Sequence, residues 1–137
     1  MGNRAVITTA PYDENHLGIY VHWNGGHESI EGFLRAARQL GYRDPTGDRA
    51  YGMARLTAAI ATFFGGESSV GIDVCKYLDT DNGDNGTWLI GPGWTLMGTT
   101  DEPILPFLSS TQNAKADAIC AEIVAKVEAA ANAKVGQ

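Results

Sequence analysis

The chain has 137 residues, a formal net charge of −6 and a sequence pI of about 4.9. A chain of this length is expected to form one domain with a core that needs no disulfide or metal. Because only ten Lys and Arg residues are spread along the sequence, direct nucleic-acid binding is disfavoured. No apolar run of about 18 residues and no signal-peptide pattern occurs, so we expect a protein of the cytoplasm without membrane contact.

Two β-strands are expected near the start of the chain. Residues 4–9 are rich in β-branched side chains, which favour extended structure. In residues 19–23 apolar and polar side chains alternate, and this period of two predicts a strand with one buried face. Ile19, Val21 and Trp23 are then expected to face the core.

Two helices are expected next. Apolar residues recur at helical spacing over residues 30–40, and charged residues occupy the opposite side. Ser29 is the expected N-cap, because its hydroxyl can accept from a free N–H group of the first turn, and Gly41 is expected to end the helix. The second helix, residues 51–64, is apolar on nearly all sides. Its only charge, Arg55, either lies along the surface or reaches toward an acidic group or a bound anion.

Three further strands are expected between residues 69 and 98. The first is indicated by Val70, Ile72 and Val74, which alternate with small and polar residues. The last two are joined by Gly91-Pro92-Gly93-Trp94, where Pro followed by Gly predicts a type II turn and a tight hairpin. A second joint, residues 79–86, contains two Asn-Gly steps and is expected to be a solvated hairpin loop.

A helix over residues 110–134 completes the pattern, since apolar residues form a narrow stripe in an Ala-rich segment. The order ββααβββα predicts an α+β fold: a mainly antiparallel sheet of about five strands, helices on one face and a C-terminal helix. Residues 1–98 are expected to form the core domain. Residues 99–137 are a connecting segment and helix that either belong to the same domain or make a homo-oligomer.

The polar corner between the second strand and the first helix is the main candidate site. Two histidines, an indole, an amide and a Gly-Gly step meet a helix start, where free backbone N–H groups favour an anion. A tight turn would also explain Asn-Gly-Gly, and this alternative stays open. For a small anionic ligand we expect these binding residues: Tyr20, His22, Trp23, Asn24, Gly25, Gly26, His27, Ser29 and Arg55.

The acidic loop is the second candidate site. Asp79, Asp81 and Asp84 give it three carboxylates among the Asn-Gly steps. An EF-hand pattern fails, because Gly83 stands where a ligand oxygen is needed and no Glu closes the loop. A looser divalent-metal site is the minor alternative to a loop whose Asp and Asn side chains bond their own backbone.

Catalytic patterns are weak. The sequence has no nucleophile-elbow motif and no H-E-x-x-H. His16, His22 and His27 would form a zinc set only if strand and loop converge, and His22 could act with Asp73 or Asp79 as an acid–base pair if the strands are adjacent. We therefore expect a binding protein without a cofactor, and keep a small hydrolase as an alternative.

Five short strings resemble a family of small uncharacterised proteins encoded by phages and prophages: GNRAVIT at 2–8, HWNGG at 22–26, FFGG at 63–66, SVGID at 69–73 and DTDNGDNGTW at 79–88. The likeness spans residues 2–98. It implies a phage or mobile-element accessory protein that opposes host defence in a bacterial cytoplasm. Such a protein would bind a nucleotide-type signal or, alternatively, inhibit a host defence effector through an acidic surface.

Overall fold

The structure is a computed structural model that describes residues 2–66, 69–103 and 105–135. The predicted α+β fold and its order of elements are confirmed. In chain order the elements are β1 (Ala5–Thr9), β2 (Leu17–Val21), α1 (His27–Gln39), α2 (Arg49–Phe63), β3 (Val70–Val74), η1 (Cys75–Tyr77), β4 (Thr87–Gly91), η2 (Pro92–Trp94), β5 (Thr95–Thr99) and α3 (Ser110–Val135), where η marks a single 3-10 turn.

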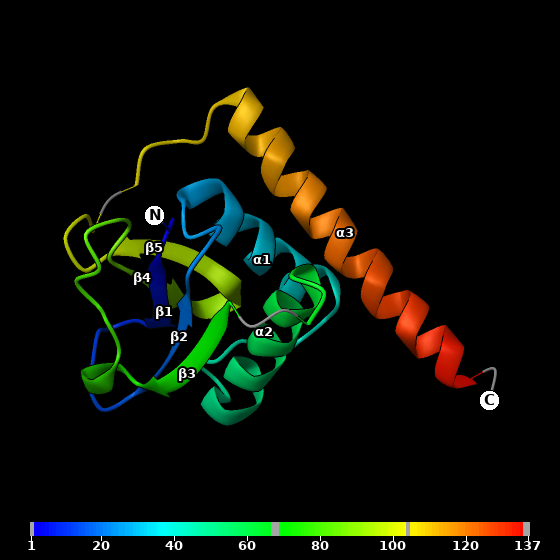
Figure 1. Ribbon diagram of the computed structural model, residues 1–137, viewed down its shortest axis with the longest axis horizontal. Helices are drawn as coiled ribbons and strands as arrows, with labels where there is room; N and C mark the ends of the chain where they lie inside the picture. Colours follow the sequence, from blue (N-terminus) through cyan, green and yellow to red (C-terminus); the bar gives the residue numbers. More distant parts are fainter. Residues whose placement is uncertain (1, 67–68, 104, 136–137) are drawn as a thin grey trace.

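The five strands form one sheet in the order β3-β2-β1-β4-β5 (Figure 1). Neighbouring strands are antiparallel except β1 and β4, which run parallel, so the sheet is mixed. The predicted hairpin at residues 79–86 is therefore wrong. β3 pairs with β2 at one edge of the sheet, so the chain must pass β2 and β1 before it enters β4. β4 then lies parallel to β1, and parallel neighbours need such a crossover connection instead of a hairpin.

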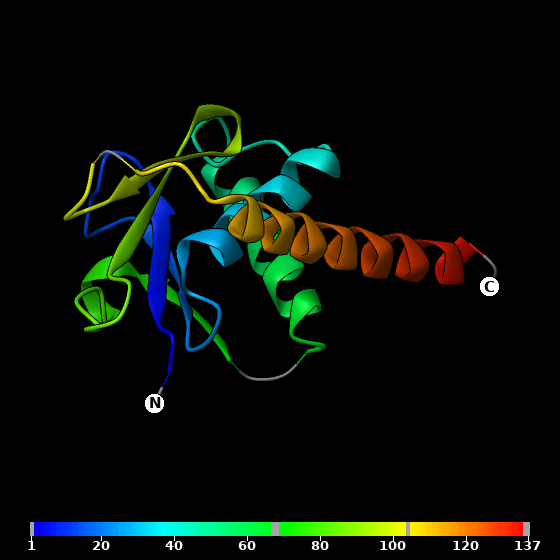
Figure 2. The same cartoon turned by 90° about the horizontal axis from the view of Figure 1, so that it is seen from above.

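The three helices lie on one face of the sheet (Figures 1 and 2). Alternate residues of the strands, such as Ile7, Ile19 and Ile90, are fully buried under Phe33 of α1 and Ile60 of α2. Burying one such side chain stabilises the fold by about 1.5–3 kcal/mol. The core thus lies between the sheet and the helix layer.

Helix α3 packs across α1 and α2. A Cβ on Gly32 of α1 would lie 2.9 Å from the Ala116 carbonyl oxygen and from Cβ of Ile119, so the glycine permits the close crossing. The buried side chains of α3 are Ala116, Cys120, Ile123 and Val124. Residues 128–134 are exposed, and this end of α3 projects beyond the domain (Figure 2). In the part of the chain that the structure describes, no helix is long and apolar enough to cross a membrane.

The turn between β4 and β5 closes one residue later than predicted. The Thr95 N–H group donates to the Pro92 carbonyl, and Gly93 and Trp94 both have positive φ values, 68° and 61°. Positive φ at both central residues is the pattern of a type I′ turn, whose twist suits a hairpin. The buried Trp94 indole donates to the Tyr42 carbonyl at 2.8 Å, a contact that holds this residue in its unusual conformation.

Candidate functional site

The corner between β2 and α1 is built around Gly25. Its N–H group donates to the Asn3 carbonyl at 2.8 Å, and its own carbonyl accepts from the Trp88 indole at 2.8 Å. A Cβ on Gly25 would lie 2.6 Å from the Asn3 carbonyl oxygen and 2.8 Å from Cβ of Ala5. Only glycine fits there, because the backbone just before β1 lies against it.

The start of α1 differs from the prediction. The helix begins at His27 with Gly26 as N-cap, so the prediction of Ser29 as N-cap is wrong. The contacts of Gly25 set the chain direction early, and helical geometry starts two residues before Ser29. Ser29 is instead 7% exposed inside the first turn, where its hydroxyl accepts from the Asn24 side chain at 3.2 Å.

The two imidazoles of the corner have different neighbours. The Tyr20 hydroxyl and Nδ1 of His22 are 3.0 Å apart, and the His22 ring meets Trp23 edge-on at 4.9 Å. Trp23 lies beyond the end of β2 and is 45% exposed, so the prediction that it faces the core is wrong: the bend that brings Gly25 to Asn3 ends the strand first. His27 lies 5.4 Å from Trp88, and burial lowers the pKa of its imidazole.

A hollow of about 350 Å³ lies at this corner, between the start of α1 and α3. Its polar lining residues are Asn3, Asn24, Glu28, Ser29 and Lys115. Lys115 comes from α3, and no local pattern could place it here because the contact joins segments far apart in the chain. The lining therefore holds one carboxylate and one ammonium group, so it is polar with little net charge.

Arg55 lies on the exposed side of α2. Its guanidinium is 4.9 Å from the centre of the Tyr51 ring and 5.9 Å from that of Tyr42. This placement matches the first of the two alternatives for Arg55, a side chain that lies along the surface. The corner hollow is lined by other residues.

The acidic loop folds around the buried amide of Asn82, which is 3% exposed. Its Oδ1 accepts from the N–H groups of Asp84, Asn85 and Gly86 at 3.1–3.2 Å, and its Nδ2 donates to the carbonyls of Asp79 and Gly86 at 3.0 Å. One side chain thus satisfies five backbone groups of the loop. The expectation that side chains bond the loop backbone agrees with this geometry.

Arg4 neutralises two of the loop's carboxylates. Its Nε donates to Asp84 at 2.8 Å, and a guanidinium nitrogen lies 3.7 Å from Asp79. Hydrogen bonds from Arg4 hold the pKa of the Asp84 carboxyl below its usual value. Among the residues that the structure describes, no three His, Cys, Asp or Glu side chains are arranged to hold a metal ion.

The three histidines considered as a zinc set contact different partners. His16 lies 3.6 Å from Asp13, whereas His22 contacts Tyr20 and His27 contacts Trp88. His22 is bonded to a phenol, not to Asp73 or Asp79, in its closest polar contact. The geometry accordingly gives these histidines separate structural contacts.

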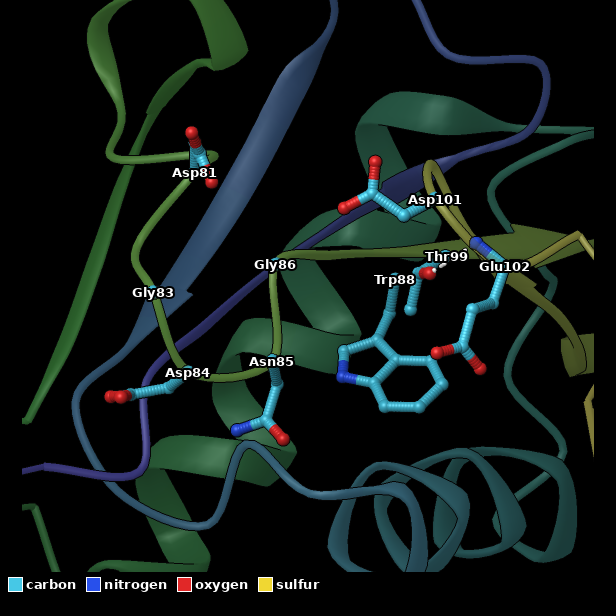
Figure 3. Close-up of a pocket in the computed structure, with 9 residues that line it drawn as sticks. All are labelled: Asp81, Gly83, Asp84, Asn85, Gly86, Trp88, Thr99, Asp101 and Glu102. Carbon is cyan, nitrogen blue, oxygen red and sulfur yellow. Dashed lines mark hydrogen bonds between the residues drawn. The ribbon is translucent and has the colours of Figure 1, made fainter.

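A groove lies where the acidic loop meets β4 and the end of β5 (Figure 3). Its first hollow, of about 350 Å³, has the Trp88 indole at its centre, with Asn85 and Glu102 on either side and Asp101 above. A second hollow of about 460 Å³ shares Asp81 and Asp101 with the first. We call the two together the acidic groove; the second hollow adds Tyr12, Thr80, Thr87 and Thr100.

The acidic groove carries negative charge without a cation of its own. Its lining contains no Lys or Arg within the described ranges. Asp84 points away from Trp88 (Figure 3), and its carboxylate accepts from Arg4 at 2.8 Å. Asp81, Asp101 and Glu102 form no salt bridge with any residue that the structure describes. Asp101 and Glu102 were not among the predicted site residues, although the sequence shows two adjacent acidic residues after the last strand.

A short turn fixes the missed residues against the sheet. The Thr99 N–H group donates to the Glu102 carbonyl, and the Glu102 N–H group donates to the Thr99 hydroxyl, both at 2.9 Å. The turn brings Asp101 to the same hollow as Asp81 although the two are twenty residues apart in the chain. Strand pairing, which local patterns do not specify, therefore creates the groove.

No known protein family, curated protein or solved structure matches this chain. The resemblance to phage and prophage proteins therefore rests on the five strings alone and stays a prediction.

Proposed function

We propose that this protein is a non-catalytic interaction module that binds a basic segment of a partner protein in the acidic groove. The observation that carries the proposal is the set of three carboxylates, Asp81, Asp101 and Glu102, in two hollows that share Asp81 and Asp101 and have no neutralising cation among the described residues. Such a surface attracts cations at a distance and favours partners of opposite charge.

The lining of the groove suits arginine and lysine side chains. Carboxylate oxygens accept their N–H groups, and charge-assisted hydrogen bonds are stronger than neutral ones. Tyr12, which is 39% exposed, adds an aromatic surface against which a guanidinium can stack. A basic segment would thus find both charge and apolar contact.

The biological setting of the proposal comes from the resemblance. A phage or mobile-element accessory protein in a bacterial cytoplasm would use the groove to inhibit a host defence effector, for example a nuclease with a basic surface. The net charge of −6 supports association with such a partner and disfavours nucleic acid as the direct ligand.

The test compares two doubly neutralised variants of equal charge. Binding of a synthetic arginine-rich peptide is measured by calorimetry at low and high salt. Asp101→Asn with Glu102→Gln should weaken binding about fivefold, since each exposed ion pair contributes roughly 0.2–1 kcal/mol. The control, Glu14→Gln with Glu128→Gln, changes exposed carboxylates outside the groove and should leave most of the affinity intact. Equal affinities for both variants would contradict the proposal.

The corner hollow supports a second candidate, binding of a small anionic ligand of nucleotide type. Lys115, the amides of Asn3 and Asn24, and the first-turn N–H groups of α1 favour it. It ranks second because Glu28 also lines the hollow and His22 is bonded to Tyr20. Calorimetry with a nucleotide panel should show binding that Lys115→Glu abolishes and Lys134→Glu preserves. Turnover of a bound nucleotide would indicate the hydrolase alternative.

A further inference from the structure

Strand β3 is one edge of the sheet, and its register shows which backbone groups face outward. The His22 N–H group donates to the Ser69 carbonyl, and the Cys75 N–H group donates to the His16 carbonyl. Hydrogen-bonded pairs alternate along an antiparallel ladder, so Gly71 and Asp73 also direct their backbone groups toward β2. The N–H and C=O groups of residues 70, 72 and 74 therefore point to the free edge.

The two edges of the sheet are protected to different degrees. At the β5 edge the 99–102 turn folds back, and the Glu102 carbonyl lies so close to Gly98 that a Cβ there would clash with it. At the β3 edge the Val74 N–H group is the only outward group that bonds a described residue: it donates to the side chain of its neighbour Asp73 at 2.7 Å. β3 contains neither Lys nor Pro, the residues that usually guard an open edge.

Ile72 makes the open edge apolar. Its side chain lies on the helix side of the sheet, paired with the fully buried Ile19, yet it is 57% exposed. A large apolar side chain beside unpaired backbone groups is a template for another strand.

We propose that two copies of this chain pair through β3, antiparallel, with the two-fold axis at Ile72. The outward groups of residues 70, 72 and 74 are symmetric about Ile72, so this register follows from the ladder. The Ile72 N–H group would donate to the carbonyl of the partner's Ile72, and the Val70 N–H group to the carbonyl of the partner's Val74. The two five-stranded sheets would then join into one.

The side chains also fit this register. Ile72 lies beside the partner's Ile72, and Val70 beside the partner's Val74, so apolar groups meet on the helix side. Asp73 lies opposite the partner's Gly71, so no two like charges face each other across the new pair. A second copy therefore covers the exposed isoleucine and satisfies the backbone without an unfavourable charge contact.

Sedimentation equilibrium over a range of concentrations tests the pairing. The average mass of the wild-type chain should rise from 14.6 kDa toward twice that value. Ile72→Lys places two ammonium groups opposite each other and should weaken association more than about tenfold. The matched control is Met97→Lys. Met97 is also an exposed apolar residue, at 47%, but it lies on β5, so this variant should dimerise like the wild type.

A cross-link provides an independent readout. Opposed residues of a hydrogen-bonded antiparallel pair have Cα atoms about 5.5 Å apart, which a disulfide can span. Ile72→Cys should form a covalent dimer on oxidation and Met97→Cys should not; Cys75 and Cys120 are both buried. A wild-type chain that stays monomeric at millimolar concentration would overturn the proposal. So would dimers that persist in Ile72→Lys but disappear in Ala130→Glu, because they would form through α3.

Discussion

The corner at residues 22–29 and the loop at residues 79–86 both contain an Asn-Gly step, but the two steps are used in opposite ways. In the corner Asn24 has the positive φ of 60°, and Gly25 is buried against β1. In the loop Gly83 has the positive φ of 77° and is exposed, and Asn82 is the buried residue. The same dipeptide therefore depends on its glycine in one place and on its asparagine in the other.

This difference shows what a glycine-rich turn reveals about ligands. The Gly-Gly step of the corner suggests close approach of a ligand to the backbone, yet the closest atoms to Gly25 belong to Asn3 and Ala5. At Gly26, by contrast, a Cβ would make only ordinary van der Waals contacts, the nearest at 3.6 Å from the Glu28 carboxylate. A group does approach the Gly25 backbone closely, but this group is another segment of the same chain and not a ligand.

The largest expected effect comes from the paired glycines. Gly25→Ala forces a Cβ into contact with Asn3 and Ala5 and strains the Trp88 bond, so we expect a loss of about 3 kcal/mol of unfolding free energy. Gly26→Ala adds a Cβ whose nearest neighbour is 3.6 Å away at an ordinary φ of −75°, and should cost less than about 0.5 kcal/mol. Urea denaturation measures both; similar losses would contradict the distinction.

Removal of the loop's central amide should have the next largest effect. Asn82→Ala leaves the backbone groups around it without their partner, and we expect a loss of about 2 kcal/mol. Asn15→Ala, in the exposed loop before β2, serves as a control and should stay within about 0.5 kcal/mol of the wild type. If Asn82→Ala is as stable as this control, the loop does not depend on the buried amide.

Local patterns predicted the elements of this fold well because their signals lie within single segments. The alternation of Val70, Ile72 and Val74 gave β3, and the apolar stripes gave the helices. Pairing of strands depends on distant residues, so the parallel β1–β4 pair was missed and the Asn-Gly steps were misinterpreted as a hairpin. The prediction of Ser29 as N-cap was wrong for the same reason, since contacts with Asn3 and Trp88 determine where α1 begins.

The candidate sites were predictable only in part. Sequence spacing identified both polar segments, and the structure shows a hollow beside each. Sequence spacing could not predict that Lys115 lines the corner hollow or that Asp101 lines the groove, because both residues belong to segments distant in the chain. Sequence spacing also could not predict that Arg4 lies against Asp84. This contact determines which carboxylates of the loop remain without a cation.

The two segments should also lose stability in different pH ranges. Burial lowers the pKa of His27, so the unfolded chain takes up the proton more readily, and stability present above about pH 6.5 falls as the pH drops below it. Hydrogen bonds from Arg4 lower the pKa of Asp84, so its contribution is present above about pH 3.9 and is lost as the pH falls through the lowered value.

Melting temperatures from about pH 8 to about pH 3 check both signs. His27→Phe keeps a ring beside Trp88 and should flatten only the upper range, whereas Asp84→Asn should flatten only the lower one. A wild-type melting temperature that rises between pH 7 and about pH 5 relative to His27→Phe would show that the histidine gains stability from protonation, contrary to the burial argument.

The smallest expected effect concerns Ser29. If Ser29 were the N-cap, its replacement by Ala would lower the unfolding free energy by about 1 kcal/mol. We expect that loss for Asp48→Ala, because Asp48 caps α2 by accepting from the Tyr51 N–H group at 3.1 Å. Inside the first turn of α1, Ser29→Ala loses one bond to Asn24 but gains helix propensity, and the two nearly cancel. We therefore expect a change within about 0.5 kcal/mol. A loss as large as that of Asp48→Ala would indicate that Ser29 is the N-cap of α1 and that Gly26 is not.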